Sequence, residues 1–110
     1  MEGPSIRRFP RTCLRTPVEL RVGEQTIHIE KAVGNLSPGG LFVNAGELPV
    51  NTNVHVRIAA VHPFEADGVV RFCEPHDGGV GIEFTNITDA NRRYLDDLIA
   101  ELARTELLAS

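Results

Sequence analysis

Several residue types are scarce in this sequence, and each shortage excludes a class of structure. Aromatic residues make up only 5% of the 110 residues, with no tryptophan and one tyrosine. The two cysteines, Cys13 and Cys73, provide no disulfide framework, and we expect them to be reduced thiols. The alternative is a single disulfide bridge between them. One hydrophobic core must therefore stabilise the domain, and a chain of this length buries about 65% of the surface that its unfolded form exposes.

Long apolar segments are absent as well. No stretch approaches the ~20 consecutive apolar residues of a transmembrane helix, so we expect no membrane insertion. The N-terminal sequence MEGPSIRRFPR has no apolar core of the kind that signal peptides carry. Together these observations predict a protein of the cytoplasm.

Positive charge is in deficit. The chain has 15 Asp and Glu residues against 11 Lys and Arg residues, which gives a net charge of −4. Nucleic-acid binders use broad cationic surfaces, and single-strand binders add aromatic platforms, so we expect neither DNA nor RNA as a partner. Against this background, Arg7, Arg8 and Arg11 crowd into five residues. A local cluster of this kind favours a small anionic ligand over a long polyanion.

No pattern of catalytic or metal-binding residues stands out. Ser37 lies in no G-x-S-x-G motif and no paired carboxylates are evident, so we expect no enzyme. A zinc site needs closely spaced cysteines or histidines. The cysteines lie far apart and the four histidines lack that spacing, so we expect no metal site: His28, His55, His62 and His76. Of these, His28 and His55 occupy polar positions of predicted strands and are expected to face solvent.

Alternating apolar and polar residues predict a β-rich domain. Six segments show such a pattern between Gly- and Pro-containing turns. A glycine at position 68 indicates a bulge within one of them. The sequence NLSPGG, residues 35–40, reads as a break between strands. Short strands at regular spacing are typical of a small barrel or sandwich, and the predicted strands are residues 17–22, 25–33, 41–44, 53–60, 64–74 and 79–84.

The two ends of the chain follow other patterns. Residues 1–16 have neither a strand nor a helix period, and we expect them to form a flexible arm. A helical period begins after Thr88, a suitable N-cap, and Asp89 favours the first turn. An apolar stripe then marks one face: Tyr94, Leu95, Leu98, Ile99, Leu102 and Leu107. We expect this face to pack on the strands, while packing on a second chain, as in a homodimer, stays open.

Two short motifs carry the strongest functional signal. The first is R-x-x-x-R at Arg7 and Arg11, and the second is N-x-S-x-x-G at Asn35, Ser37 and Gly40. Neither motif is specific alone, because each occurs by chance in many sequences. In this order, around predicted strands and ahead of a terminal helix, they resemble the signature of the PilZ domain, a bacterial family that binds cyclic di-GMP.

The resemblance covers residues 5–108 and implies a fold that is mainly β. It implies a six-stranded antiparallel β-barrel over residues 17–87, closed by a C-terminal helix over residues 88–108. Residues 1–16 are then the arm that carries the arginine motif. The whole is one PilZ-like domain.

The resemblance also assigns ligand contacts. Arg7 and Arg11 match the motif, and Arg8 between them is a further candidate. An arginine fork bonds phosphate bidentately, matches the O6 and N7 acceptors of guanine, and stacks on a base. Because cyclic di-GMP offers both phosphates and guanines, arginines on one arm can bind both groups of the ligand.

The second motif supplies polar side chains, and its glycines let a ligand approach the backbone closely. Asn35 and Ser37 have short side chains able to reach a base edge. Gly39 and Gly40 permit close approach of the backbone. The predicted ligand-binding set therefore joins these four residues to the three arginines.

The resemblance implies a receptor rather than an enzyme. We expect cyclic di-GMP as the ligand, no further cofactor, and ordering of the N-terminal arm over the bound ligand. A receptor of this kind signals to an unidentified protein partner, which the family places in bacterial motility or surface polysaccharide control. The alternative is a PilZ-like adaptor that has lost the ligand and acts by protein–protein contact.

Overall fold

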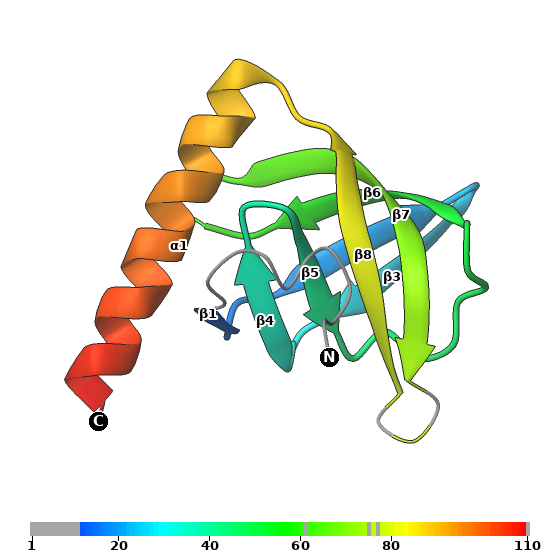
Figure 1. Cartoon of the computed structure of the whole chain (residues 1–110), viewed down its shortest axis with the longest axis horizontal. Helices are drawn as coiled ribbons and strands as arrows, with labels where there is room; N and C mark the ends of the chain where they lie inside the picture. Colours follow the sequence, from blue (N-terminus) through cyan, green and yellow to red (C-terminus); the bar gives the residue numbers. More distant parts are fainter. Residues whose placement is uncertain (1–11, 61, 75, 77, 110) are drawn as a thin grey trace, which may run out of the picture.

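A computed structural model describes residues 12–60, 62–74, 76 and 78–109, with side chains described as far as residue 105. Eight strands and one helix form this part of the chain (Figure 1). In chain order they are β1 (Thr12–Leu14), β2 (Val18–Val22), β3 (Gln25–Ile29), β4 (Gly34–Ser37), β5 (Gly40–Val43), β6 (Asn53–Ile58), β7 (Phe64–Glu74), β8 (Gly79–Asn86) and α1 (Asp89–Ala109).

The strands form one curled sheet in which every pairing is antiparallel. Their order is β1-β4-β5-β8-β7-β6-β2-β3, so β1 and β3 are the edges. The strands β8, β7 and β6 lie between the β4-β5 and β2-β3 hairpins and join them into one sheet (Figure 1). Helix α1 packs against β1 and β7. The mainly β class and the C-terminal helix are as predicted.

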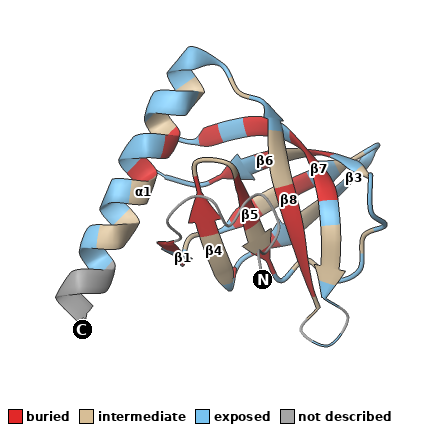
Figure 2. Cartoon of the chain, in the orientation of Figure 1, coloured by how far each residue is buried: buried red, intermediate tan, exposed pale blue. Residues whose placement is uncertain are grey.

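Alternation along the strands gives the sheet an inner and an outer face. Leu20, Leu36 and Ile82 are fully buried on the inner face, and Leu95 of α1 is fully buried against it. Figure 2 shows buried and exposed positions alternating along the first half of β7. The predicted helix stripe is buried at Leu95 and Leu98 and half-buried at Tyr94, Ile99 and Leu102. The stripe therefore packs on the sheet, and Leu107 lies outside the described side chains.

The predicted number of six strands is wrong, because the described residues contain eight. Strand β1 lies within residues 1–16, the segment predicted to be an arm, and pairs with β4. Strand β4 lies across the start of NLSPGG, which was predicted to be a break. Both strands are too short to show a period of two. They form because Leu14 and Leu36 enter the core.

Two local predictions are confirmed. The register of β7 against β8 shifts between Asp67 and Gly68, as expected for a bulge at this glycine. The N–H of Asn91 donates a hydrogen bond to Thr88 Oγ1 over 3.2 Å. Thr88 is therefore the N-cap of α1.

Candidate ligand-binding hairpin

The N-x-S-x-x-G motif forms the hairpin of β4 and β5. Ser37 pairs with Gly40, so Pro38 and Gly39 make a two-residue turn. Asn35 lies three residues before Pro38, opposite Phe42. The structure thus brings together the four predicted site residues that it describes. Arg7, Arg8 and Arg11 lie outside the described residues.

Hydrogen bonds fix the conformation of the turn. The Ser37 hydroxyl donates to the carbonyl oxygen of Gly40 over 3.4 Å and accepts from the N–H of Gly39 over 3.3 Å. The N–H of Phe84 in β8 donates to the carbonyl of Gly39 over 3.0 Å. Ser37 is 3% exposed. The hydroxyl that the sequence assigns to a ligand is therefore engaged inside the hairpin.

A residue that sequence reasoning missed also contacts this turn. Arg92, in the first turn of α1, donates from one terminal guanidinium nitrogen to the carbonyl of Pro38 over 2.9 Å. The two residues are 54 positions apart in the chain. Only the folded arrangement brings them together, so no sequence motif signals the contact. It links the helix directly to the candidate site.

Gly40 is required by the packing of strands. A Cβ atom built at this position would overlap the backbone carbonyl oxygen of Ile82 in β8. Backbone atoms of a paired strand cannot rotate away, so any side chain here would push β5 from β8. The motif glycine therefore has a structural role that is independent of a ligand.

Asn35 is the motif residue whose side chain is both on the outer face and partly accessible. Its neighbour Leu36 is fully buried on the inner face, and successive side chains of a strand point to opposite faces. Asn35 is half-buried. Its amide offers two donors and an acceptor. It is therefore the described residue best suited to reach the edge of a base.

Two hollows of the described surface lie away from the β4-β5 hairpin. One hollow lies beside β2 and β3, near Glu19 and His28. Another lies between α1 and the end of β6, near His62 and Tyr94. No hairpin residue lines either hollow. Asn35 lies on the outer face of the sheet, so a ligand that this residue binds would lie on that face.

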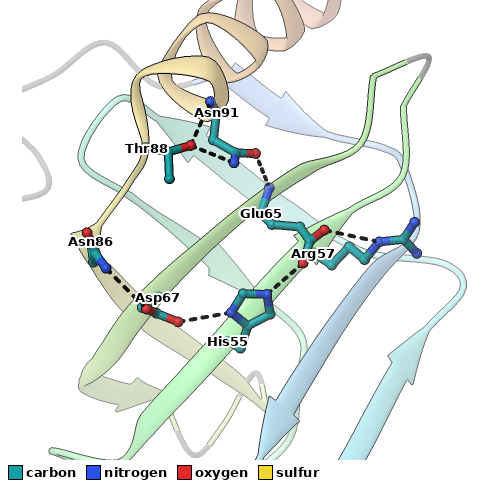
Figure 3. A network of polar contacts seen from close by, with 7 residues as sticks. All are labelled: His55, Arg57, Glu65, Asp67, Asn86, Thr88 and Asn91. Atoms are coloured by element: carbon teal, nitrogen blue, oxygen red, sulfur yellow. Dashed lines mark hydrogen bonds and ion pairs between the residues drawn. The ribbon is translucent and has the colours of Figure 1, made fainter.

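A separate polar network surrounds His55 on β6 (Figure 3). Its Nδ1 lies 2.9 Å from Asp67 Oδ1, and its Nε2 lies 2.7 Å from Glu65 Oε1. The imidazole is 29% exposed, so the prediction that it faces solvent is only partly right. Alternation identified the outward position of His55, but its two carboxylate partners depend on the register of β6 against β7.

The network also reaches the start of the helix. The backbone N–H of Glu65 donates to Asn91 Oδ1 over 2.8 Å, and the Asn91 side chain donates to Thr88 Oγ1 over 2.9 Å. Asn86 Nδ2 lies 3.5 Å from Asp67 Oδ2 (Figure 3). The Asn91 contacts join β7 to the N-terminus of α1, and the Asn86 contact joins β7 to the end of β8.

The carboxylates shift the titration of the imidazole. The hydrogen bond to Asp67, followed by that to Glu65, raises the pKa of His55 above its ordinary value of 6.5. The hydrogen bond from His55 in turn lowers the pKa of Asp67. Within the part of the chain that the structure describes, no three His, Cys, Asp or Glu residues form a group suited to a metal ion. No helix in this part is long and apolar enough to cross a membrane.

Comparison with known families decides the classification. The model of the PilZ domain family matches residues 5–101. This chain belongs to the PilZ domain family. The match begins before β1 and ends within α1, so it includes the arginine motif as well as the hairpin. The suspected resemblance is thereby confirmed.

Solved structures show the same fold. The structure of the Bacillus subtilis inhibitor of motility (MotI/DgrA) matches with a TM-score of 0.64 and 19% sequence identity. The alignment covers 97% of this chain and 53% of that protein, so this PilZ chain spans about half its length. At this identity the likeness establishes the fold alone. No curated protein matches the chain.

Proposed function

We propose that this PilZ domain is a receptor for cyclic di-GMP. The observation that carries the proposal is the hairpin of β4 and β5, which presents Asn35 on the outer face of the sheet, in a chain whose family match includes the arginine motif. In this proposal, residues 7–11 close over the ligand and complete the site. PilZ domains are receptor or adaptor domains, and we propose no catalytic step for this one.

Each part of the site has a matching part of the ligand. Arg7 and Arg11 bind the phosphates and guanines through their planar forks, and Arg8 adds a third cation. Asn35 bonds the edge of a guanine. Ser37, Gly39 and Gly40 hold the turn close to the ligand. The acidic surface of the rest of the chain makes binding depend on these local arginines.

A receptor domain acts through a partner. We propose that ligand binding changes the surface formed by the hairpin and the first turn of α1, because Arg92 joins the two. A protein partner in the cytoplasm reads that surface. The similar structure from Bacillus subtilis is named as an inhibitor of motility. Motility or surface polysaccharide control is therefore the proposed process.

One observation favours the adaptor alternative. Ser37 and Gly40 both have structural roles, since the hydroxyl bonds within the turn and the glycine lets β5 approach β8. These two residues would be needed in a PilZ domain that never binds the ligand. An adaptor acting by protein–protein contact is therefore the second candidate function.

Isothermal titration of cyclic di-GMP into the wild-type protein and Arg11→Ala distinguishes the two. A hydrogen bond from a charged group contributes about 1.5–3 kcal/mol. We expect saturable binding by the wild type and affinity roughly 10- to 150-fold weaker in Arg11→Ala. Arg104→Ala is the matched control, because Arg104 is exposed on α1 and pairs with Glu101 in its own helix. It should bind like the wild type.

Two results would contradict the receptor proposal. A wild-type protein that is folded and yields no heat favours the adaptor. Equal losses in Arg11→Ala and Arg104→Ala would mean that net charge, rather than the arginine motif, controls binding.

A further inference from the structure

A row of residues crosses the outer face of the sheet through five strands. Register places Cys13 opposite Asn35, Asn35 opposite Phe42, Phe42 opposite Gly81, and Gly81 opposite Phe72. Directly opposite residues of paired strands share a face. The motif asparagine therefore has a phenylalanine as its neighbour on β5, and a second phenylalanine lies two strands further along.

The two phenylalanines form a pair of parallel rings. The ring centroids of Phe42 and Phe72 are 5.8 Å apart and the planes differ by 15°. Two glycines of β8 make room for them. A Cβ on Gly79 would overlap the Phe42 ring, and a Cβ on Gly81 would overlap the Phe72 ring. Both rings are half-buried, so part of each remains accessible.

Their position outside the core is informative because aromatics are scarce in this chain. Phe64 is fully buried, and Phe84 packs edge-on against it with centroids 5.3 Å apart on the inner side. Phe42 and Phe72 are absent from the core cluster. A solvent-side pair of rings gains less from burial than a core pair does. A ligand that covers the rings would recover that free energy.

We propose that Phe42 and Phe72 form a stacking platform for a guanine base of cyclic di-GMP, beside Asn35, which bonds the base edge. The inference rests on the proposed function and adds to it the residues that hold the base. Bases stack on aromatic side chains because every base presents a π-face, and one such contact contributes roughly 5- to 150-fold in affinity. In the proposed site, the arginines bind the phosphates and the polar edges of the guanines, and the platform binds the flat face of one guanine.

The first test measures cyclic di-GMP affinity by isothermal titration for Phe42→Leu, Phe42→Tyr and Phe64→Leu. Leucine keeps apolar volume but removes the flat ring, and tyrosine keeps the ring. We expect Phe42→Leu to weaken binding by roughly 5- to 150-fold and Phe42→Tyr to bind like the wild type. Phe64→Leu makes the same change in the core, so the folded protein should retain its affinity even if it is less stable.

A second test uses the absence of tryptophan from the chain. Phe72→Trp introduces a single tryptophan into the platform, and a stacked guanine should quench its fluorescence as cyclic di-GMP is added. Thr26→Trp is the control, because Thr26 is exposed on the edge strand β3. This variant should show no quenching. The test remains usable if Phe42→Leu does not fold.

The outcomes separate this inference from the proposed function. If the wild type binds, and Phe42→Leu binds equally well while Phe72→Trp is not quenched, the platform is overturned and the receptor stands. If the folded wild type does not bind at all, both are overturned. Equal losses in Phe42→Leu and Phe64→Leu would indicate a general effect of core packing, which also contradicts the platform.

Discussion

His55 illustrates how single residues control the outer face of this domain. Both ring nitrogens lie within hydrogen-bond distance of a carboxylate oxygen, one on Asp67 and one on Glu65. Only the doubly protonated imidazolium donates to both at once. The charged form is therefore favoured in the folded protein, and the hydrogen bond to Asp67 is the largest cause of the raised pKa.

This pairing predicts a pH dependence of stability. Because the pKa of His55 is raised on folding, its contribution is fully present below the unfolded value and is lost as the pH rises through the folded pKa. The pKa of Asp67 is lowered on folding, so its contribution to stability is present at higher pH and is lost as the pH falls through the pKa of the folded protein. The network should therefore stabilise the folded protein most at pH values between the lowered pKa of Asp67 and the raised pKa of His55.

Urea unfolding of wild type and His55→Gln checks this prediction. The free energy of unfolding of the wild type should exceed that of the variant at about pH 5.5, and the difference should shrink at about pH 8.5. Asp67→Asn removes the largest cause of the shift and should reduce the pH dependence while His55 remains. A difference between wild type and His55→Gln that does not change with pH would contradict the account.

At the residue scale, sequence reasoning found positions but not partners. Alternation placed His55 on the outward side of its strand, and the N-x-S-x-x-G motif identified Asn35 beside a turn. The carboxylate partners of His55 come from the register of β6 against β7. The engagement of the Ser37 hydroxyl depends on the closed turn. Pairing between distant segments is set by the whole fold, so a local pattern does not contain it.

At the scale of elements, the hairpin of β4 and β5 is held from three directions. Strand β1 pairs with β4, strand β8 pairs with β5, and Arg92 of α1 bonds the turn. Such support keeps the motif in one conformation. It also gives the helix a direct contact with the candidate site, which is the route we propose for a signal to a partner.

Close approach of β5 and β8 predicts an unequal response to two alanine substitutions. Gly40→Ala would drive its Cβ into the Ile82 backbone, so we expect destabilisation of about 1–3 kcal/mol, as for other overpacked sites. Gly81→Ala meets the far end of the Phe72 side chain, which can rotate, and should cost less. Urea unfolding of both variants measures the difference. A Gly40→Ala protein as stable as Gly81→Ala would show that the strands separate without cost.

The sequence patterns predicted the longer strands and the four-residue β5, and they missed β1 and β4. The strands from β6 to β8 lie at the predicted segments because each is long enough to show a period of two. β1 and β4 are three and four residues long. In β4 the sequence NLS is followed by Pro-Gly-Gly, so the turn chemistry obscured the strand. Their pairing with neighbours and the burial of Leu14 and Leu36, rather than local propensity, make them strands.

At the scale of the whole molecule, the curled sheet separates two tasks. The inner face and α1 bury the apolar side chains that stabilise the domain. The outer face carries the motif hairpin and the paired rings of Phe42 and Phe72. In the proposed receptor, Asn35 and the two rings therefore serve recognition apart from the core, and we expect a substitution at these positions to alter binding without unfolding the domain.

The central claim is that the outer face around the β4-β5 hairpin binds cyclic di-GMP. Amide chemical shifts of the isotope-labelled wild-type protein, recorded as cyclic di-GMP is added, test it most directly. We predict that the largest changes occur at Asn35 to Phe42 and at Gly79 to Gly81, while the β2-β3 hairpin stays unchanged. Changes confined to the hollow near His62 and Tyr94, or no changes in a folded protein, would contradict the account.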